Sequence, residues 1–334
     1  MNASTNESLS ESIFYSGVAN ADDRMFNNWF LIGITVVFVA ILVFGVVGNT
    51  LVCMIIAKRP EMRTATNYYL FSLAVSDNLI LITGVPVESI QIWQDNEWNF
   101  GEAACKLQFV MLYTAGRVSV LAIIVVSIER YIAVCHPLRA HTFSGKTRAM
   151  WIIALIWIIS AVVTIPGGFA TTLYTFEDYA PDGTLIGYYE TCIEDQKKLP
   201  FLPNDFPANE MYVFLFFLMP MAVLTVLYAR IAWVIRRRKN IGESHDANAS
   251  NATITKTIGI LVLCFFIFCA PMNLISILGK YLQLDGSSMN AVVLISMLLF
   301  YLNCVINPII YNATSVNYRT AFRATINFWQ SGRE

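Results

Sequence analysis

Seven long apolar stretches constrain the fold of this chain more than any other feature of its sequence. A helix needs about 20 mainly apolar residues to cross a bilayer, and only helices and closed barrels satisfy their backbone hydrogen bonds inside lipid. Only 13% of the residues are charged, against about 25% in soluble domains. We therefore expect an all-α membrane protein, built as a bundle of seven transmembrane helices. The expected helices are Trp29–Ala57, Asn67–Ile92, Ala104–Cys135, Ala149–Leu173, Glu210–Ile235, Thr257–Tyr281 and Asn290–Tyr311.

The charges in the linkers predict the orientation. Lys and Arg gather after the first, third and fifth stretches and in the tail, whereas the N-terminus and the other loops are acidic. Cytosolic loops carry an excess of Lys and Arg, so we expect a multi-pass protein of the plasma membrane with its N-terminus outside. The expected division is an extracellular N-terminus at 1–28, a transmembrane domain at 29–312, and helix 8 with a cytosolic tail at 313–334.

The two termini carry weaker signals. Sequons at Asn2 and Asn6 lie on the expected outer side and predict glycosylation. Sequons at Asn248 and Asn251 fall on the expected cytosolic side, so the motif alone is not specific. In Asn317–Trp329, apolar residues recur at helical spacing between arginines, which predicts a short amphipathic helix on the membrane surface. A frayed tail is the alternative.

The third stretch closes with Glu129-Arg130-Tyr131, an acid and a base at the membrane boundary. Charges at this depth are costly and are functional candidates by default. We expect Glu129 to hold Arg130 in a resting state and to release it in a second state. The hydroxyls of Tyr228 and Tyr311 would approach Arg130 if the last three helices shifted, which gives a two-state element.

Asp77 lies near the middle of the second stretch, and other polar residues are expected at the same depth. A carboxylate surrounded by amide and hydroxyl oxygens suits Na⁺ or a proton. Hydrogen bonding between helices without an ion is the alternative. The polar residues expected around Asp77 are Asn49, Ser119, Asn303 and Asn307.

A second group of residues is expected nearer the outer surface. Glu88 follows Asp77 by about three helical turns and shares its inward face. The acidic rim should attract a cationic ligand, although acidic loops are also common solvated surfaces. Arg117 has three candidate roles: pairing with Glu210, binding a ligand carboxyl terminus, or reaching toward the interface. The residues expected to line a ligand cavity are Glu88, Gln108, Leu112, Tyr113, Arg117, Met272, Asn273, Ser276 and Tyr301.

Cysteines and prolines give further expectations. Cys105 and Cys192 both face the oxidising side, so we expect a disulfide between them. Prolines within the stretches can kink their helices. The other cysteines are expected to be packing residues: Cys53, Cys135, Cys264, Cys269 and Cys304. The prolines are Pro86, Pro166, Pro220, Pro271 and Pro308.

Several short motifs occur in a fixed order along the seven stretches. They are Gly48-Asn49, Leu73 to Asp77, Cys105, Glu129 to Tyr131, Trp157, Pro220, Tyr228, Phe265, Pro271 and Asn307-Pro308-Ile309-Ile310-Tyr311. With these motifs the chain, from Phe30 to Trp329, resembles the rhodopsin-like (class A) G-protein-coupled receptors. The resemblance implies a G-protein switch at Glu129, Arg130, Tyr131, Tyr228 and Tyr311, and an allosteric Na⁺ site around Asp77. It also implies a core relay of Pro220, Val120, Phe265 and Cys269.

Within that family, Met62–Asp77 and Gly84–Glu88 resemble the neuromedin U, pyrokinin and capa neuropeptide receptors. This implies an extracellular peptide with an amidated, Arg-containing C-terminus, a contact from Glu88 to that arginine, and a heterotrimeric G protein of the Gq class. Receptors for ghrelin, neurotensin or thyrotropin-releasing hormone are alternatives.

The chain departs from the family pattern in two places. Cys269 stands where a tryptophan is usual, so the relay or the basal activity should differ. Only Ser331 follows Trp329 as a phosphorylation site, so arrestin recruitment by the tail is in doubt. A non-signalling decoy or scaffold receptor therefore remains a rival, as does a transporter or channel, although no repeat supports the latter. We expect no enzymatic activity, no metal centre and no nucleic-acid partner.

Overall fold

The computed structural model describes residues 28–94, 96–137, 145–179, 183–195, 198–199, 207–241, 246–278 and 286–331. Within these ranges seven helical spans are long and apolar enough to cross a membrane, as the sequence predicts. The spans are formed by α2 (Asn28–Lys58), α3 (Ala65–Trp93), α4 (Gly101–Cys135), α6 (Lys146–Ala170), the continuous run α7–η3–α8, α9 (Asp246–Leu278) and α10 (Gly286–Thr314).

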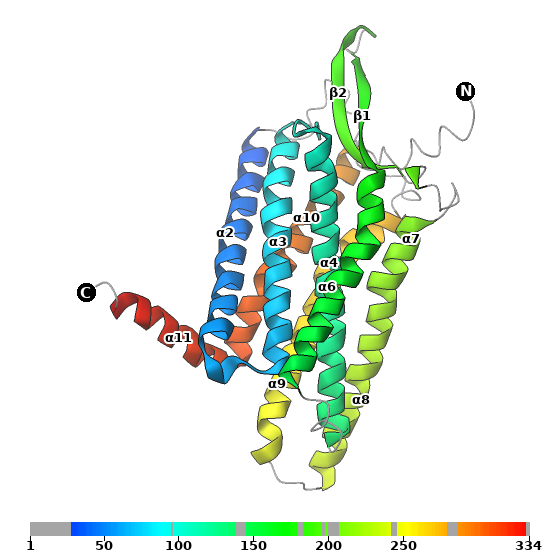
Figure 1. The fold of residues 1–334 in the computed structure, drawn as a ribbon. Coiled ribbons are helices and arrows are strands. Elements are labelled where there is room, and N and C mark those ends of the chain that lie inside the picture. The colour runs from blue at the N-terminus through cyan, green and yellow to red at the C-terminus, as the bar shows by residue number, and fades with distance from the viewer. Residues whose placement is uncertain are drawn as a thin grey trace.

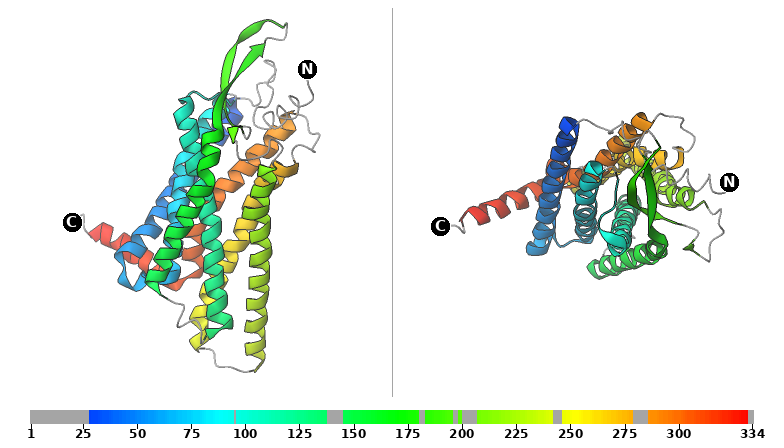
Figure 2. Two further views of the ribbon diagram at one scale, coloured as in Figure 1. Left: turned by 45° about the vertical axis from the view of Figure 1, so that its right-hand side comes forward. Right: turned by 90° about the horizontal axis from the view of Figure 1, so that it is seen from above.

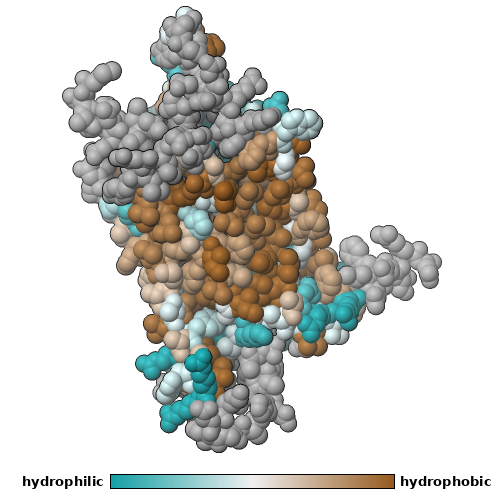
Figure 3. Space-filling view, turned by 180° about the vertical axis from the view of Figure 1, so that it is seen from behind, coloured by the Kyte–Doolittle hydropathy of each residue, from teal (hydrophilic) through white to brown (hydrophobic). Residues whose placement is uncertain are grey.

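The helices stand side by side as an elongated bundle (Figures 1 and 2). The helix α4 is central, because it packs against α3, α6, α8 and α9. The helix α10 closes the bundle by packing against α9, α2 and α3. On the face seen in Figure 3, apolar side chains form a broad band across the middle, and hydrophilic side chains gather at the lower end. A band of this kind is what a bilayer requires of the surface of a spanning bundle.

A β-hairpin marks one end of the bundle, which we call the hairpin end (Figure 1). Strand β1 (Thr171–Tyr179) pairs antiparallel with β2 (Leu185–Glu194). The expected disulfide is present, and Cys105 at the start of α4 is bonded to Cys192 of β2. The Trp98 backbone N–H also donates to the Glu190 carbonyl oxygen at 2.7 Å. The hairpin is therefore fixed to the N-terminal end of α4.

The hairpin is the main departure from the predicted secondary structure. The fourth apolar stretch was expected to stay helical to Leu173, but α6 ends at Ala170 and β1 begins at Thr171. The sequence from Thr171 to Phe176 is rich in β-branched and aromatic residues, which favour strands. These residues extend the apolar run, so hydropathy alone placed the boundary too late.

The fifth span is not a uniform helix. Between α7 (Ala208–Val213) and α8 (Met219–Ile241), the residues Phe214–Leu218 form a π-helical turn, labelled η3. The Met219 N–H bonds to the Phe214 carbonyl, five residues back. Pro220 follows at once and has no N–H to donate, so a break in the α-helical ladder is expected here. The irregularity that the sequence predicts at Pro220 is thus a π-helical turn just before the proline.

The opposite end of the bundle we call the basic end, because Arg148, Arg236 and Arg237 lie there. From this end α11 (Val316–Ser331) runs sideways, away from the bundle axis (Figure 1). It confirms the predicted helix 8. Its Tyr318 and Ala321 are buried in a cluster with α2, α3 and α10, which joins the start of α11 to the bundle.

Candidate functional site

The polar core lies in the middle of the bundle and joins four helices. The Asn307 side chain donates to Asp77 Oδ2 at 2.7 Å. Asn49 donates to the Cys304 carbonyl at 2.9 Å, and the hydroxyls of Ser76 and Ser119 lie 2.9 Å apart. The predicted core residues are buried, Asp77 at 1% exposure. Among the described residues these bonds link α2 with α10, α3 with α10, and α3 with α4.

Two oxygen atoms of the polar core accept no hydrogen bond from the described residues. Oδ1 of Asp77 and Oδ1 of Asn49 are buried without a hydrogen-bond partner among the described residues. An unsatisfied buried carboxylate oxygen is costly, and carboxylate or amide oxygens are the ligands that a hard cation prefers. Asn303 is also buried, at 8% exposure. The side chains present therefore fit a small cation such as Na⁺.

Above this core, toward the hairpin end, Glu88 and Tyr301 lie close enough to interact electrostatically. The Tyr301 ring is buried with Phe38 and Leu112 in one cluster. Its hydroxyl lies against Gly84, where an added Cβ would be 2.3 Å away. Gly84 is therefore needed for Tyr301 to occupy this position. The structure brings three predicted ligand residues together here, from α3, α4 and α10.

Arg117 lies deeper, on another side of α4, and is only 8% exposed. Its guanidinium donates to the Thr164 hydroxyl on α6. Its Cζ lies 5.7 Å from the ring centre of Tyr113, 5.0 Å from Tyr212 and 5.2 Å from Phe216. These distances are in the range of cation–π attraction. Arg117 is thus enclosed by aromatic rings, so the idea that it reaches toward the interface is wrong.

Glu194 of β2 acts on Arg117 from the hairpin end. Its Oε1 approaches Gly167 of α6 so closely that a Cβ there would be 2.9 Å away. Burial raises the pKa of the Glu194 carboxyl, and the positive charge of Arg117 opposes that rise. The charges of Glu194 and Arg117 therefore interact electrostatically next to the disulfide-bonded hairpin.

The remaining predicted ligand residues divide into two kinds. Asn273 donates to the Cys269 carbonyl at 2.8 Å, and Ser276 donates to the Asn273 carbonyl at 2.9 Å, both within α9. Gln108 on α4 and Met272 on α9 are partly buried in the upper halves of their helices. Among the described residues, the polar side chains of Asn273 and Ser276 thus bond to carbonyl groups of their own helix, α9.

The predicted ion pair of Glu129 and Arg130 is not formed at the basic end, although the two charges lie close enough to interact electrostatically. Glu129 Oε1 instead pairs with Arg148 of α6 at 2.8 Å and accepts a hydrogen bond from Tyr69 of α3 at 3.1 Å. Arg130 donates to the Thr66 hydroxyl at 2.7 Å. Successive residues on a helix do not face each other. Adjacency in the sequence was therefore a poor guide to pairing.

The other switch residues surround this site. Tyr228 on α8 lies close enough to Arg130 to interact electrostatically. Tyr311 on α10 is 1% exposed, and its hydroxyl has no hydrogen-bond partner among the described residues. Its ring packs against Tyr318 of α11, with centres 5.4 Å apart. Tyr131 packs against His136 at 5.5 Å.

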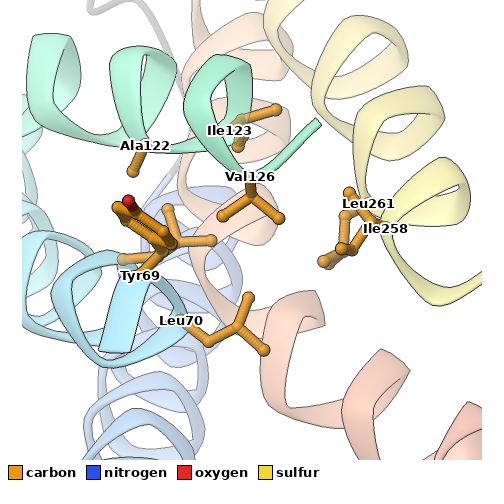
Figure 4. Close-up of a pocket in the computed structure, with 8 residues that line it drawn as sticks. Tyr69, Leu70, Ala122, Ile123, Val126, Ile258 and Leu261 are labelled. Atoms are coloured by element: carbon orange, nitrogen blue, oxygen red, sulfur yellow. The ribbon is translucent and has the colours of Figure 1, made fainter. Parts of the chain in front are cut away.

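The predicted relay residues lie between the two ends. Val120, Phe265 and Cys269 belong to one buried cluster shared by α4, α8 and α9, and Pro220 is buried at the start of α8. Below them is a small apolar cavity (Figure 4). It is lined by Tyr69, Leu70, Leu73, Ala122, Ile123, Val126, Ile258 and Leu261.

Sequence reasoning missed several residues of these sites: Tyr69, Thr66, Arg148, Thr164, Tyr212 and Phe216. Of these, only Arg148 belongs to a sequence signal, the excess of Lys and Arg after the third apolar stretch. The others are common residue types within apolar runs, and their contacts depend on how the helices rotate against one another.

Comparisons with known proteins agree with this architecture. Residues 48–311 match the family described as "7 transmembrane receptor (rhodopsin family)". Human neuromedin-U receptor 2 is 35% identical over 308 residues, which cover 89% of this chain and 72% of that receptor. The pyrokinin-1 receptor of Drosophila melanogaster is 31% identical, with 89% and 80% covered. The human growth hormone secretagogue receptor type 1 is 30% identical, with 89% and 81% covered.

Proposed function

The chain belongs to the rhodopsin family of seven-transmembrane receptors, and from that premise we propose which ligand and which partner it serves. Its relatives include proteins named as receptors for neuromedin U and for pyrokinin, which supports a peptide-activated, G-protein-coupled receptor. We propose that the peptide carries an amidated, Arg-containing C-terminus and that the G protein is of the Gq class.

One observation carries the ligand proposal. Glu88 is a half-buried carboxylate of α3, and none of the ion pairs among the described residues neutralises it. A carboxylate at this depth is costly unless a cation compensates it. An arginine of the peptide would supply that cation. The neighbouring Tyr301 would close one side of the contact.

The orientation follows from the same proposal. The hairpin end faces the outside of the cell, and the basic end faces the cytosol, as the excess of Lys and Arg predicts. The 1–28 segment is then extracellular, 29–312 is the transmembrane domain and 313–334 is cytosolic. The proposed glycosylation sites Asn2 and Asn6 lie outside the described residues.

The proposed mechanism couples the two ends through the shared cluster of α4, α8 and α9. Binding at the hairpin end favours a state in which α9 moves away from the bundle at the basic end. The peptide can shift this equilibrium only by its differential affinity for the two states. In the active state Arg130 contacts the G protein, and Tyr228 and Tyr311 support it. Cys269 transmits the shift in place of a larger aromatic residue.

The polar core supplies a second control in this proposal. Asp77, Asn49, Ser119 and Asn303 would hold Na⁺ through their oxygen atoms. The cation would neutralise the buried carboxylate. Ionised Asp77 without a cation is less stable in this apolar setting, so Na⁺ would favour the state in which these residues stay together.

A calcium-mobilisation assay tests the function directly. Cells that express the receptor are exposed to a panel of amidated neuropeptides, including neuromedin U-like, pyrokinin-like and ghrelin-like peptides. A response to the Arg-containing amidated peptides, blocked by a Gq inhibitor, is the expected result. A response confined to peptides without arginine would contradict the ligand proposal, and a response that survives the inhibitor would contradict the coupling.

The contact with Glu88 has its own test. Glu88→Gln should weaken an Arg-ending peptide about tenfold or more, because truncating one partner of a buried charge pair is costly. The same peptide with citrulline in place of arginine should be weakened little. Glu97→Gln is the matched control, because Glu97 is an acid of the same end that lies outside the helices. Equal losses for both peptides would rule out the contact.

A further inference from the structure

Glu129 is held by two residues from neighbouring helices, neither of which is its sequence neighbour Arg130. Its side chain is 10% exposed and pairs with Arg148 at 2.8 Å. The Tyr69 hydroxyl donates to the same oxygen, Oε1, at 3.1 Å. A carboxylate this buried needs a cation, and Arg148 supplies it.

Arg130 is held less firmly than Arg148. Its guanidinium donates to the neutral Thr66 hydroxyl, whereas the guanidinium of Arg148 contacts a carboxylate. A hydroxyl carries no charge to compensate a guanidinium, so among the described residues Arg130 is compensated only by charges at longer range, such as Glu129. In this arrangement Arg130 is therefore the less firmly bound of the two arginines.

We propose that Arg148 is a positioning residue that competes with Arg130 for Glu129 and thereby sets the activity of the receptor without ligand. While Arg148 occupies Glu129, Arg130 stays available to the G protein. When Arg148 is lost, Glu129 turns to the next nearest cation and withdraws Arg130. This inference rests on the proposed role of Arg130 in G-protein contact, but not on the identity of the peptide.

The location of Arg148 supports an exchangeable pair. It lies in the first turn of α6, where the helix dipole disfavours a positive charge. Glu129 offsets that disadvantage, so each residue stabilises the other. The Arg148 side chain is still 34% exposed, so it can leave the pair and be solvated, which a fully buried arginine cannot do.

Tyr69 connects the pair to the bundle interior. Its hydroxyl holds Glu129, while its ring borders the apolar cavity between α3, α4 and α9 (Figure 4). A shift of α9 would change the space beside this ring. Tyr69 therefore lies where a movement of α9 could reach Glu129 directly.

Thermal melting of the purified receptor tests the pairing without ligand or G protein. Glu129→Gln and Arg148→Gln are compared singly and together, and Glu129→Gln and Arg130→Gln are compared in the same way. Contacting residues show non-additive effects, and independent ones add. We expect the first pair to be strongly non-additive and the second, whose charges interact only at longer range, to be weakly so. In the Arg148→Gln background the non-additivity of the second pair should increase, and an unchanged value there would overturn the exchange.

Ligand-free nucleotide exchange on a purified G protein tests the consequence. The wild-type receptor should exceed the rate without receptor, and Arg148→Gln should lower that excess about two- to fivefold, the range of one partly exposed ion pair. Arg148→Lys should restore it, since the positive charge returns. Lys146→Gln, at the start of the same helix, should leave it unchanged.

The remaining outcomes are equally decisive. No exchange above the background in the wild type, or an unchanged or higher rate in Arg148→Gln, would overturn the regulatory role. So would an equal effect of Arg148→Gln in the Glu129→Gln background, where there is no charge to compete for. Failure of the peptide panel would affect only the ligand proposal, because neither experiment here uses a peptide.

Discussion

The helix α4 carries two arginines in different surroundings, and the difference separates the two halves of the bundle. Arg117, in the half toward the hairpin, is enclosed by three aromatic rings and bonds to Thr164. Arg130, at the basic end, donates to the Thr66 hydroxyl, and no aromatic cage of this kind surrounds it among the described residues. Arg117 is held by short contacts from several helices, whereas Arg130 has, within the described ranges, one side-chain hydrogen bond and longer-range attraction to Glu129 and Tyr228.

The two arginines of α4 therefore differ in how easily they can change partners. Contacts from several helices must break together before Arg117 can move, which makes it rigid. A single hydrogen bond to a hydroxyl is lost more easily than a set of contacts from several helices, so Arg130 can change partners. The hairpin half is thus expected to be the stable part and the basic end the responsive part.

The largest expected effect concerns Arg130. Arg130→Met should reduce signalling about tenfold or more, because arginines are enriched among the few residues that dominate the binding energy of a protein interface. The thermal midpoint should change little. Signalling is measured at matched surface expression. If Arg130→Met signalled normally, Arg130 would not be the switch and the contrast with Arg117 would fail.

Arg117 should show the opposite behaviour. Arg117→Ala should lower the free energy of unfolding by about 2–4 kcal/mol, because it leaves a cavity among the rings and removes the cation–π contacts. Arg117→Met keeps most of the volume and should cost less than about 1.5 kcal/mol. Thermal melting measures both. An alanine variant as stable as the wild type would show that the ring cage contributes nothing.

The packing of Tyr301 gives a third, smaller test. An alanine Cβ at Gly84 would lie 2.3 Å from the Tyr301 hydroxyl, so Gly84→Ala should cost about 1–3 kcal/mol of stability through overpacking. Gly116→Ala in α4 is the matched control, because nothing lies within 4 Å of its Cβ position. That control should be neutral or stabilising by up to about 1 kcal/mol. Equal melting points would mean that Tyr301 adjusts freely.

The architecture of the bundle and the surroundings of its two arginines differ in how far the sequence could predict them. The helical spans, the disulfide of Cys105 and Cys192 and the final helix follow from hydropathy, compartment and periodicity, and the structure confirms them. The contact of Asp77 with Asn307 also follows, because a carboxylate in mid-membrane must find a polar partner.

The arginine sites could not be predicted in the same way. The rings around Arg117 come partly from the π-helical turn, which rotates Phe216 relative to a regular helix. The pairing of Glu129 with Arg148 depends on the approach of α6 to α4. Both are consequences of packing between distant segments, which no local pattern in the sequence records.

The last and smallest effect concerns the pH dependence of the hairpin half. Burial raises the pKa of Glu194 above its ordinary value of 4.5, and Arg117 acts against that rise. The folded state therefore takes up a proton more readily than the unfolded state. It loses stability as the pH rises from 4.5 to the raised value and is constant above it.

Removing Arg117 should extend this window, since nothing then opposes the effect of burial. Between pH 4.5 and 7, Arg117→Met should lose about 2 °C more in its melting temperature than the wild type. The double variant with Glu194→Gln should lose no more than the single Glu194→Gln variant, because no carboxyl is left to titrate. Parallel pH profiles for wild type and Arg117→Met would show that the two charges do not interact, and the cage around Arg117 would then be purely aromatic.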